Sequence, residues 1–337
     1  MTSVTMTIRQ VGSLCTKALR RRCRVALQHA IRLAVTVPVT RKLLNFAYLR
    51  LSWSHKLILH SHFCTLFRGY RGRLSPAVWA VEFAGKRIKI PLRPRRIWLD
   101  WDTAISICGH DIDLKQTYAF LCGSPFPPEL FIDVGANYGT HSLLFLTRGI
   151  DTVTFEPNVA CHDDFRAYCE VNGVRPRIEG IALGDCESTV DLWYPEGDTW
   201  LGSTDMNVQS ELRSRSDVKC QRVTQKTLDH FRSEYGNRRL LIKIDTEGNE
   251  AAILRGGYCT LKHDRPVVIF ESWPDERQRG ELFRILSGFG YVLCALPWTQ
   301  TTTPQVVTKQ HFLRSVSTNF LAVPASGLSN GSIWERA

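Results

Sequence analysis

The sequence predicts an α/β protein built on a doubly wound, mainly parallel sheet, with a basic helical extension at the N-terminus. After about residue 115, apolar runs alternate with helical stretches, which is typical of a parallel sheet covered by helices on both faces. Residues 1–81 contain 14 Lys and Arg and no Asp or Glu, whereas the rest of the chain is slightly acidic. The 337 residues can hold one such domain and an extension.

The basic extension comes first, and we expect it to cover residues 1–75. Most cations between residues 17 and 37 fall on one face of a helix. The opposite, apolar face comprises Leu19, Cys23, Ala26, Ala30, Leu33 and Val37. Pro38 should end this helix. Basic amphipathic helices lie on anionic membranes, which predicts peripheral membrane contact through residues 14–73. Packing on the chain's own body, an organelle transit peptide and nucleic-acid binding are the alternatives.

Three further segments follow the extension. Residues 76–114 should contain a hairpin, since "VWAVEFAGKRIKIPL" alternates around Ala84-Gly85. Residues 115–325 form the α/β domain, and residues 326–337 form a tail. The expected strands are "LFIDVGA", "TVTFEP", "RIEGIALG", "LLIKIDTEG", "PVVIFES", "YVLCAL" and "NFLAVP", and the expected helices are 140–148, 161–172, 250–255 and 277–287.

The eleven cysteines are dispersed, without a C-x-x-C pair or the spacing of a structural zinc site. We therefore expect reduced thiols and a cytoplasmic protein. The uncharged stretches of the extension are shorter than the ~18 apolar residues that span a bilayer. We expect no transmembrane helix and no secretory signal, so any membrane contact would be peripheral, on the inner face.

Carboxylates stand at or near the ends of five expected strands. They are Asp133, Glu156, Asp185, Asp245 with Glu247, and Glu271. In an open parallel sheet, ligands bind beyond the carboxyl ends of the strands, near the point where strand order reverses. This pattern predicts a shared acidic cleft.

The stretch "FIDVGANYG", residues 131–139, resembles a nucleotide-binding loop but is one glycine short of G-x-G-x-x-G. Asp133 would repel a pyrophosphate and would suit a ligand with a cationic amino-acid end, such as S-adenosylmethionine. Glu156 can accept both ribose hydroxyls, and Asp185 is placed to meet the adenine amino group. The predicted cofactor-binding residues are Asp133, Gly135, Asn137, Gly139, Glu156, Pro157 and Asp185.

These residues resemble the FkbM-type methyltransferases. The resemblance covers about residues 115–325 and rests on "FIDVGANYG", "FEPN", "ALGD", "TLDHF", "LIKIDTEGNEAAILRGG" and "PVVIFES". It implies a class I, Rossmann-like methyltransferase fold, S-adenosylmethionine as methyl donor, and O-methylation of a saccharide, glycoconjugate or related secondary metabolite. His141 stands where such proteins more often carry an apolar or aromatic residue.

The "KIDTEG" stretch carries the candidate catalytic residues. Side chains alternate along a strand, so Lys243, Asp245 and Glu247 should share one side. They form either a buried Lys243-Asp245 ion pair with Glu247 capping the next helix, or an acceptor site. In the second case Asp245 orients the acceptor hydroxyl, and Glu247 or Glu271 removes its proton. We assign no metal, although the three carboxylates would also suit magnesium.

Two other functions fit the composition less well. A nucleic-acid methyltransferase would use the positive charge, but that charge is confined to the extension. The Asn-Pro-Pro-Tyr motif of amine-methylating enzymes is absent, and "DTEG" stands in its place. A non-catalytic scaffold that binds the donor would not need the catalytic acids. A small-molecule or glycan acceptor is therefore the expected partner.

Overall fold

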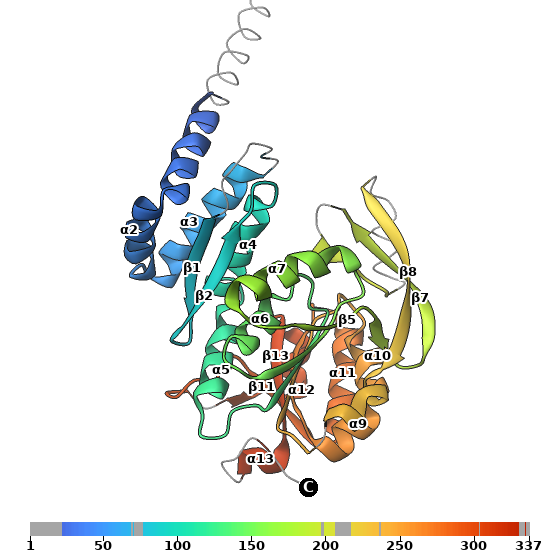
Figure 1. Ribbon diagram of the computed structural model, residues 1–337. Coiled ribbons are helices and arrows are strands. Elements are labelled where there is room, and N and C mark those ends of the chain that lie inside the picture. The colour runs from blue at the N-terminus through green and yellow to red at the C-terminus, as the bar shows by residue number, and fades with distance from the viewer. Residues whose placement is uncertain are drawn as a thin grey trace, which may run out of the picture. The chain divides into compact units, whose positions relative to one another are not determined.

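The computed structural model describes residues 22–68, 70, 77–196, 199–205, 217–235, 237–302, 304–329 and 334. Parts of the predicted extension and tail lie outside these residues. Contacts between Cα atoms divide the chain into two compact units, drawn in Figure 1. The first unit runs to residue 82 and includes residues 87–110, and the second contains residues 83–86 and the chain from residue 111 onward.

The first unit combines four helices with a hairpin among its described residues. The elements are a helix over residues 22–36, α2 (Pro38–Leu49), α3 (Trp53–Phe67), β1 (Ala77–Phe83), β2 (Lys86–Leu92) and α4 (Ile97–Cys108). The first helix ends before Pro38, as predicted, and Pro38 then starts α2, where its missing N–H costs nothing. Ala84 and Gly85, with φ angles of 46° and 74°, make the predicted hairpin turn. Trp79 of β1 packs edge-on against Trp101 of α4 and anchors the hairpin.

The second unit contains an eight-stranded sheet in the order β12-β11-β13-β10-β9-β3-β4-β5. The strands are β3 (Leu130–Val134), β4 (Asp151–Phe155), β5 (Arg177–Glu179), β9 (Leu240–Ile244), β10 (Val267–Glu271), β11 (Tyr291–Ala295), β12 (Gln305–Val306) and β13 (Asn319–Pro324). The five strands from β10 to β5 are parallel, and β13 is antiparallel to both of its neighbours. The predicted doubly wound, mainly parallel sheet is confirmed.

Helices cover both faces of this sheet (Figure 1). They are α5 (Ile112–Gly123), α6 (Thr140–Leu146), α7 (His162–Asn172), α9 (Arg232–Tyr235), α10 (Glu250–Gly256), α11 (Glu276–Gly288), α12 (Lys309–Arg314) and α13 (Ala325–Ser329). Strand order reverses at β3, because the chain proceeds from β3 to β4 and β5 on one side and later to β9 and β10 on the other. The carboxyl ends of β3 and β9 therefore flank the place where such folds bind ligands.

One strand prediction was wrong. The run "RIEGIALG" was expected to be a single strand, but only β5 joins the main sheet, and β6 (Ala182–Gly184) belongs to a separate sheet of order β6-β8-β7. Gly180 lies at the break, and glycine weakens a strand interior. The partners β7 (Ser188–Pro195) and β8 (Val218–Thr227) carry mostly polar, partly exposed residues, so hydrophobic alternation did not reveal them.

Candidate active site

The loop between β3 and α6 requires glycine at two positions. Gly135 has a φ of 76°, and a Cβ placed there would lie 1.8 Å from the backbone oxygen of Asp245. Gly139 has a φ of 66°, and its Cβ would lie 2.3 Å from the ring of Phe165. Both positions combine a left-handed backbone with no room for a side chain. The loop therefore passes directly against the segment that follows β9.

Asp133 lies beneath this loop rather than in the pocket. The side chain is fully buried, and Oδ2 accepts hydrogen bonds from the backbone N–H of Ser142 at 3.0 Å and from its hydroxyl at 2.7 Å. Burial raises the pKa of Asp133, although Lys243 and Ser142 act in the opposite direction. Its position fixes the start of α6. A direct contact between Asp133 and a donor stays a prediction.

Glu156 lies at the carboxyl end of β4 and lines the pocket. One carboxylate oxygen accepts the backbone N–H of Asn137 at 2.6 Å, and the other accepts that of Asn158 at 2.7 Å. Burial raises the pKa of Glu156 to about 7, although the two backbone hydrogen bonds act to lower it. The carboxylate is thus held in one orientation by two loops, with further lone pairs available to a ligand.

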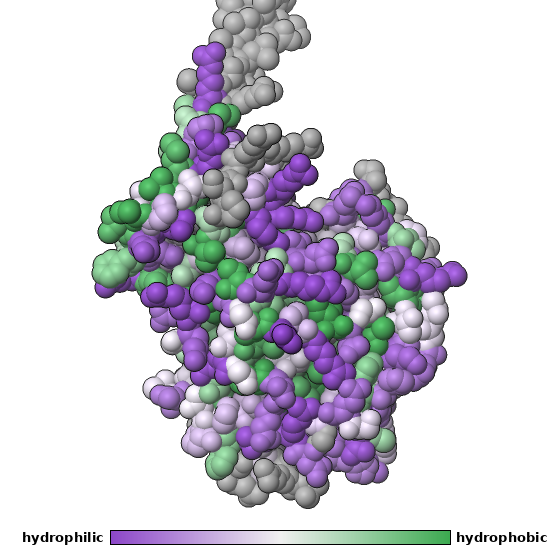
Figure 2. Space-filling model, viewed as in Figure 1, coloured by the Kyte–Doolittle hydropathy of each residue, from purple (hydrophilic) through white to green (hydrophobic). Residues whose placement is uncertain are grey.

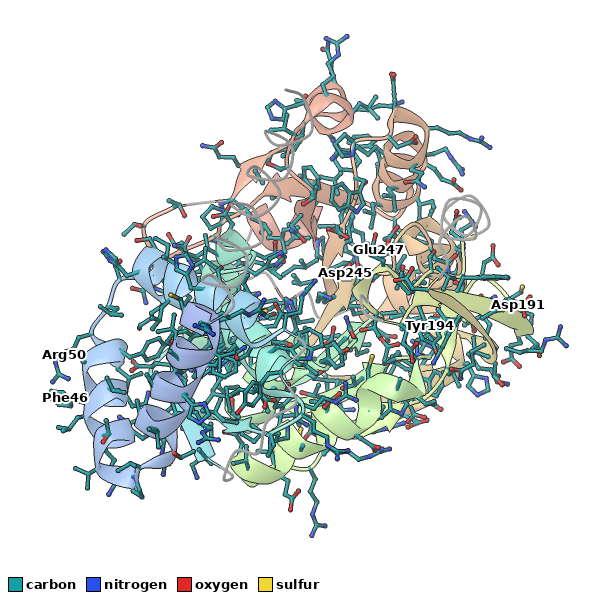
Figure 3. The ribbon with its side chains drawn as sticks, turned by 90° about the horizontal axis from the view of Figure 1, so that it is seen from above. Phe46, Arg50, Asp191, Tyr194, Asp245 and Glu247 are labelled. Atoms are coloured by element: carbon teal, nitrogen blue, oxygen red, sulfur yellow. The ribbon has the colours of Figure 1, made fainter. Side chains whose placement is uncertain are left out.

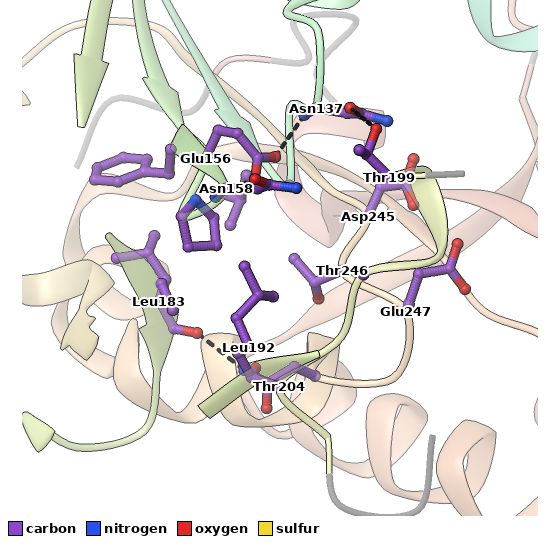
Figure 4. Close-up of a pocket in the computed structure, with 17 residues that line it drawn as sticks. Asn137, Glu156, Asn158, Leu183, Leu192, Thr199, Thr204, Asp245, Thr246 and Glu247 are labelled. Carbon is purple, nitrogen blue, oxygen red and sulfur yellow. Dashed lines mark hydrogen bonds between the residues drawn. The ribbon is translucent and has the colours of Figure 1, made fainter. Parts of the chain in front are cut away.

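The pocket lies between the glycine loop, the end of β4 and the segment after β9 (Figure 4). One part of its wall is apolar and comprises Phe155, Pro157, Leu183 and Leu192. The other part is polar and comprises Asn137, Glu156, Thr199, Thr204, Asp245 and Glu247. A ligand with an aromatic base at one end and charged groups at the other matches this division.

Asp185 does not line this pocket, in contrast to the sequence-based expectation. Its carboxylate lies 3.0 Å from the guanidinium of Arg255 on α10, and Arg255 also pairs with Glu281. The residues of the same segment that reach the pocket are Ala182 and Leu183. The chain turns outward after β6, which carries Asp185 to a partly exposed ion-pair network. Its predicted contact with an adenine amino group has no support in this geometry.

Lys243 joins the core of the sheet to the pocket. The parallel register places it directly beside Asp133 on the neighbouring strand, and its Nζ lies 3.6 Å from Asp133 and 3.0 Å from Asp245. Burial disfavours the charged ammonium, but attraction to Asp245 and Asp133 outweighs that effect and raises the pKa of Lys243. The predicted Lys243-Asp245 ion pair is present, and it extends to a third group.

Three carboxyl groups gather at the end of β9 and β10. Asp245, Glu247 and Glu271 each offer an oxygen within 4.8 Å of the others, and Figure 3 shows Asp245 and Glu247 close together. Glu247 comes there through a left-handed backbone, with a φ of 54°, and not through strand alternation, because β9 ends at Ile244. Such an oxygen-only set would also suit a hard cation such as magnesium, which is the alternative to the metal-free acceptor site assigned from the sequence.

The pKa values of two of these acids, Glu271 and Glu247, are raised to different extents. Burial raises the pKa of Glu271 to about 10, with further contributions from the charge of Asp245 and a hydrogen bond to it. The raised pKa favours the protonated form of Glu271, which can donate to Asp245. Burial, followed by the charges of Asp245 and Glu250, raises the pKa of Glu247 to about 7. Glu247 is therefore the member that can exchange a proton near neutral pH.

Glu250 organises the loop that carries Asp245 and Glu247, and sequence reasoning missed it. Its Oε1 accepts the backbone N–H of Thr246 at 2.9 Å, the Thr246 hydroxyl at 3.0 Å and the backbone N–H of Gly248 at 3.3 Å. Glu250 is the first residue of α10, and its carboxylate holds the loop before the helix; no side-chain cap, from Glu247 or another described residue, closes this helix. An acid in the first turn of a predicted helix was the available signal.

Residues from the loop after β7 also close the pocket. The Thr199 hydroxyl donates to the side-chain oxygen of Asn137 at 3.0 Å, and the Ser203 hydroxyl donates to the backbone oxygen of Glu247 at 2.8 Å. This loop carries no motif, so its part in the pocket could not be predicted from the sequence. Its contacts tie the glycine loop and the acidic loop together.

His141 lies on α6 and contacts the helix before β3. The Tyr118 hydroxyl and His141 Nδ1 lie 3.2 Å apart, and the two rings meet edge to face. Burial raises the pKa of Tyr118, and the charges of Asp133 and Asp245 add to the effect. His141 thus packs beside the buried acidic network and is not among the residues that line the pocket.

Comparison with known proteins gives one family match. The family model of the methyltransferase FkbM domain matches residues 133–293. That range begins at Asp133 and contains Glu156, Asp245, Glu247 and Glu271. No curated protein is similar enough in sequence to match the chain.

Three solved structures are similar to parts of the chain. Methyltransferase FkbM from Methylobacillus flagellatus KT has 12% sequence identity and a TM-score of 0.39, and the match covers 80% of this chain and 60% of that one. Precorrin-6y C5,15-methyltransferase from Geobacter metallireducens GS-15 has 10% identity and a TM-score of 0.32, and the match covers 63% of this chain and 82% of that one. The 16S rRNA N2 G1207 methyltransferase of T. thermophilus, solved with AdoMet and guanosine, has 9% identity and a TM-score of 0.34. This match covers 74% of this chain and 51% of that one.

The family match and the architecture agree. The order of the strands, the reversal at β3 and the glycine loop at the carboxyl end of β3 are those expected of a class I methyltransferase. Residues 133–293, which match the methyltransferase FkbM domain, thus fold with the topology of a class I methyltransferase.

Proposed function

We propose that the pocket binds S-adenosylmethionine and that the enzyme methylates a hydroxyl group of a saccharide, glycoconjugate or related metabolite. The observation that carries this proposal is Glu156, whose two oxygens are fixed by the N–H groups of Asn137 and Asn158 at the carboxyl end of β4. A carboxylate held in this way can accept two adjacent ribose hydroxyls.

The residues present fit the donor. The apolar wall made by Phe155, Pro157 and Leu183 suits an adenine ring, and Gly135 lines the same pocket where the loop meets the backbone of Asp245. The wall beyond it carries Asp245, whose negative charge suits a cationic methionine end. A pyrophosphate would be repelled by the same carboxylate.

The donor supplies an electrophilic methyl group on a sulfonium, so the protein must position the acceptor and accept its proton. Asp245, fixed by Lys243 at 3.0 Å, is the group that orients the acceptor hydroxyl. Glu247 is the proposed base, because it lines the pocket and its pKa is raised to about 7. Glu271, with its pKa raised to about 10, is instead a hydrogen-bond donor that holds Asp245.

Calorimetry with the donor and a transfer assay test this proposal together. Wild-type protein should bind S-adenosylmethionine, and Glu156→Ala should abolish measurable binding while the protein remains folded. Labelled methyl groups should then pass to glycan or lipid-linked sugar fractions and not to RNA. Undiminished affinity in Glu156→Ala would refute the donor site, and transfer only to RNA would refute the acceptor class.

We also propose a cytoplasmic location. All ten cysteines of the described residues are free thiols, which supports a reducing compartment. Across the described residues, the structure contains no helix long and apolar enough to cross a membrane.

A further inference from the structure

The helices of the first unit leave apolar side chains in solvent. Of the eighteen large hydrophobic side chains that are exposed in the described residues, eleven lie between residues 25 and 58. Figure 2 shows hydrophobic residues gathered over the helices at the N-terminal end. Single exposed hydrophobic residues are common in proteins, but a concentration of this kind marks an interaction surface.

The first helix buries the side opposite to its apolar face. The described residues of the predicted apolar face, Cys23, Ala26, Ala30, Leu33 and Val37, are all exposed. The covered side contains the buried Val35, and Arg24 on the same side donates hydrogen bonds to the backbone oxygens of Thr65, Leu66 and Arg68 at the end of α3. Packing of the apolar side on the chain's own body is therefore contradicted for these residues.

Helix α2 also packs one side on the first unit and leaves apolar side chains exposed on the other. Asn45 exchanges two hydrogen bonds with the backbone of Ala80 on β1, and Tyr48 is buried against Trp79. Several apolar residues face solvent, among them Val39 (70% exposed), Leu43 (66%) and Phe46 (60%). Their spacing of four and three residues forms a continuous stripe along the helix.

Cations border the stripe. Arg50 continues it by one further turn, and its guanidinium lies 3.4 Å from the centre of the Phe46 ring (Figure 3). Lys42 is exposed beside Leu43. No acidic residue occurs anywhere in residues 1–81, so nothing in this segment would repel an anionic partner.

We propose that this surface, defined by Val39, Leu43, Phe46 and Arg50 with the exposed face of the first helix, binds an anionic lipid bilayer. Apolar side chains enter the boundary between headgroups and acyl chains, while Lys and Arg stay with the phosphates. A second copy of the chain is a poor occupant, because two acid-free cationic surfaces repel each other. The membrane contact does not depend on the chemistry of the pocket. It would give the enzyme acceptors that are themselves attached to the membrane.

Co-sedimentation of the full chain with vesicles tests the proposal. The protein should bind vesicles of phosphatidylcholine mixed with phosphatidylglycerol, bind pure phosphatidylcholine poorly, and be released by high salt. The double variant Leu43→Gln with Phe46→Gln should lower binding at least about tenfold, because two apolar side chains no longer enter the bilayer. Val316→Gln, which changes an even more exposed apolar residue of the second unit (92% exposed), should bind like the wild type.

A second variant covers the case in which the first fails to fold. Lys42→Glu with Arg50→Glu leaves the apolar stripe intact and should abolish the preference for anionic lipid. Binding that is unchanged in both double variants, or absent in the wild type, would overturn the proposal. A wild-type dimer that Leu43→Gln with Phe46→Gln converts to a monomer would overturn it in favour of a second copy.

Discussion

The Nζ atom of Lys243 lies 3.0 Å from Oδ2 of Asp245, across the boundary between the sheet and the pocket. The same ammonium lies 3.6 Å from Asp133, which is fully buried. One cation therefore neutralises a carboxylate of the core and orients a carboxylate of the active site. The stability of the sheet and the geometry of the site are linked through this group.

Replacing Lys243 should be strongly destabilising. Lys243→Met leaves the buried Asp133 without its countercharge, and breaking a buried pair in this way costs about 3–5 kcal/mol. The free energy of unfolding, measured by urea titration, should fall by that amount. The control Lys262→Met changes an exposed lysine and should shift stability by less than about 0.5 kcal/mol. If Lys243→Met lowered the free energy of unfolding no more than the control does, Lys243 would not stabilise the buried Asp133.

Gly135 and Gly149 form a matched pair for testing the glycine loop. Their φ angles are 76° and 77°, but a Cβ at Gly149 would meet nothing within 4 Å, whereas one at Gly135 would meet the backbone of Asp245 at 1.8 Å. Gly149→Ala should cost only the strain of the left-handed backbone, about 1–2 kcal/mol. Gly135→Ala should cost about 1–3 kcal/mol more and should also abolish donor binding. Denaturation and calorimetry on both variants measure this, and equal effects would contradict the close approach.

Stability should fall as pH rises, because of Glu271. Its pKa is raised to about 10 in the folded protein from an ordinary value of 4.5, so the folded state holds a proton that the unfolded chain releases. The contribution of this group is complete below the unfolded value and is lost progressively as pH rises toward the folded value.

Glu271→Gln keeps a hydrogen-bond donor beside Asp245 but cannot ionise. The free energy of unfolding of this variant, compared between about pH 6 and about pH 9, should fall less than that of the wild type. Glu276→Gln, on the exposed first turn of α11, should keep the wild-type slope. Parallel slopes for wild type and Glu271→Gln would rule out the raised pKa.

Methyl transfer should depend on the ionisation of Glu247. Because its pKa is raised to about 7, kcat/KM should increase with pH below that value and level off above it. Glu247→Gln should lower kcat by about 10²–10⁴ and leave donor affinity within a few-fold of the wild type. A profile that is flat between about pH 6 and about pH 8 would exclude Glu247 as the base and direct attention to the acceptor itself.

Features that depend on neighbouring residues in the chain could be predicted from the sequence. The break at Pro38, the turn at Ala84 and Gly85, and the buried strands around Asp133 and Lys243 follow from proline chemistry, glycine freedom and hydrophobic runs. The positions of Glu156 and Asp245 at strand ends were also predictable, because the carboxyl ends of parallel strands share one edge of a sheet.

Features that depend on which segments meet in space could not be predicted. Asp133 and Asp185 stand in the same kind of position as Glu156, yet one lies under the glycine loop and the other pairs with Arg255 on α10. Glu250 was missed because its partners are backbone N–H groups that only the folded loop presents.

The sequence by itself determined the α/β architecture, the glycine loop and the acidic character of the cleft, since these depend on residue type and spacing along the chain. Only the tertiary structure decided which acids face the pocket, how their pKa values shift, and that the helices before residue 68 leave many apolar side chains exposed. The physical reason is that burial and charge pairing arise between distant segments. A periodic pattern shows that a helix has two faces, but packing decides which face is covered.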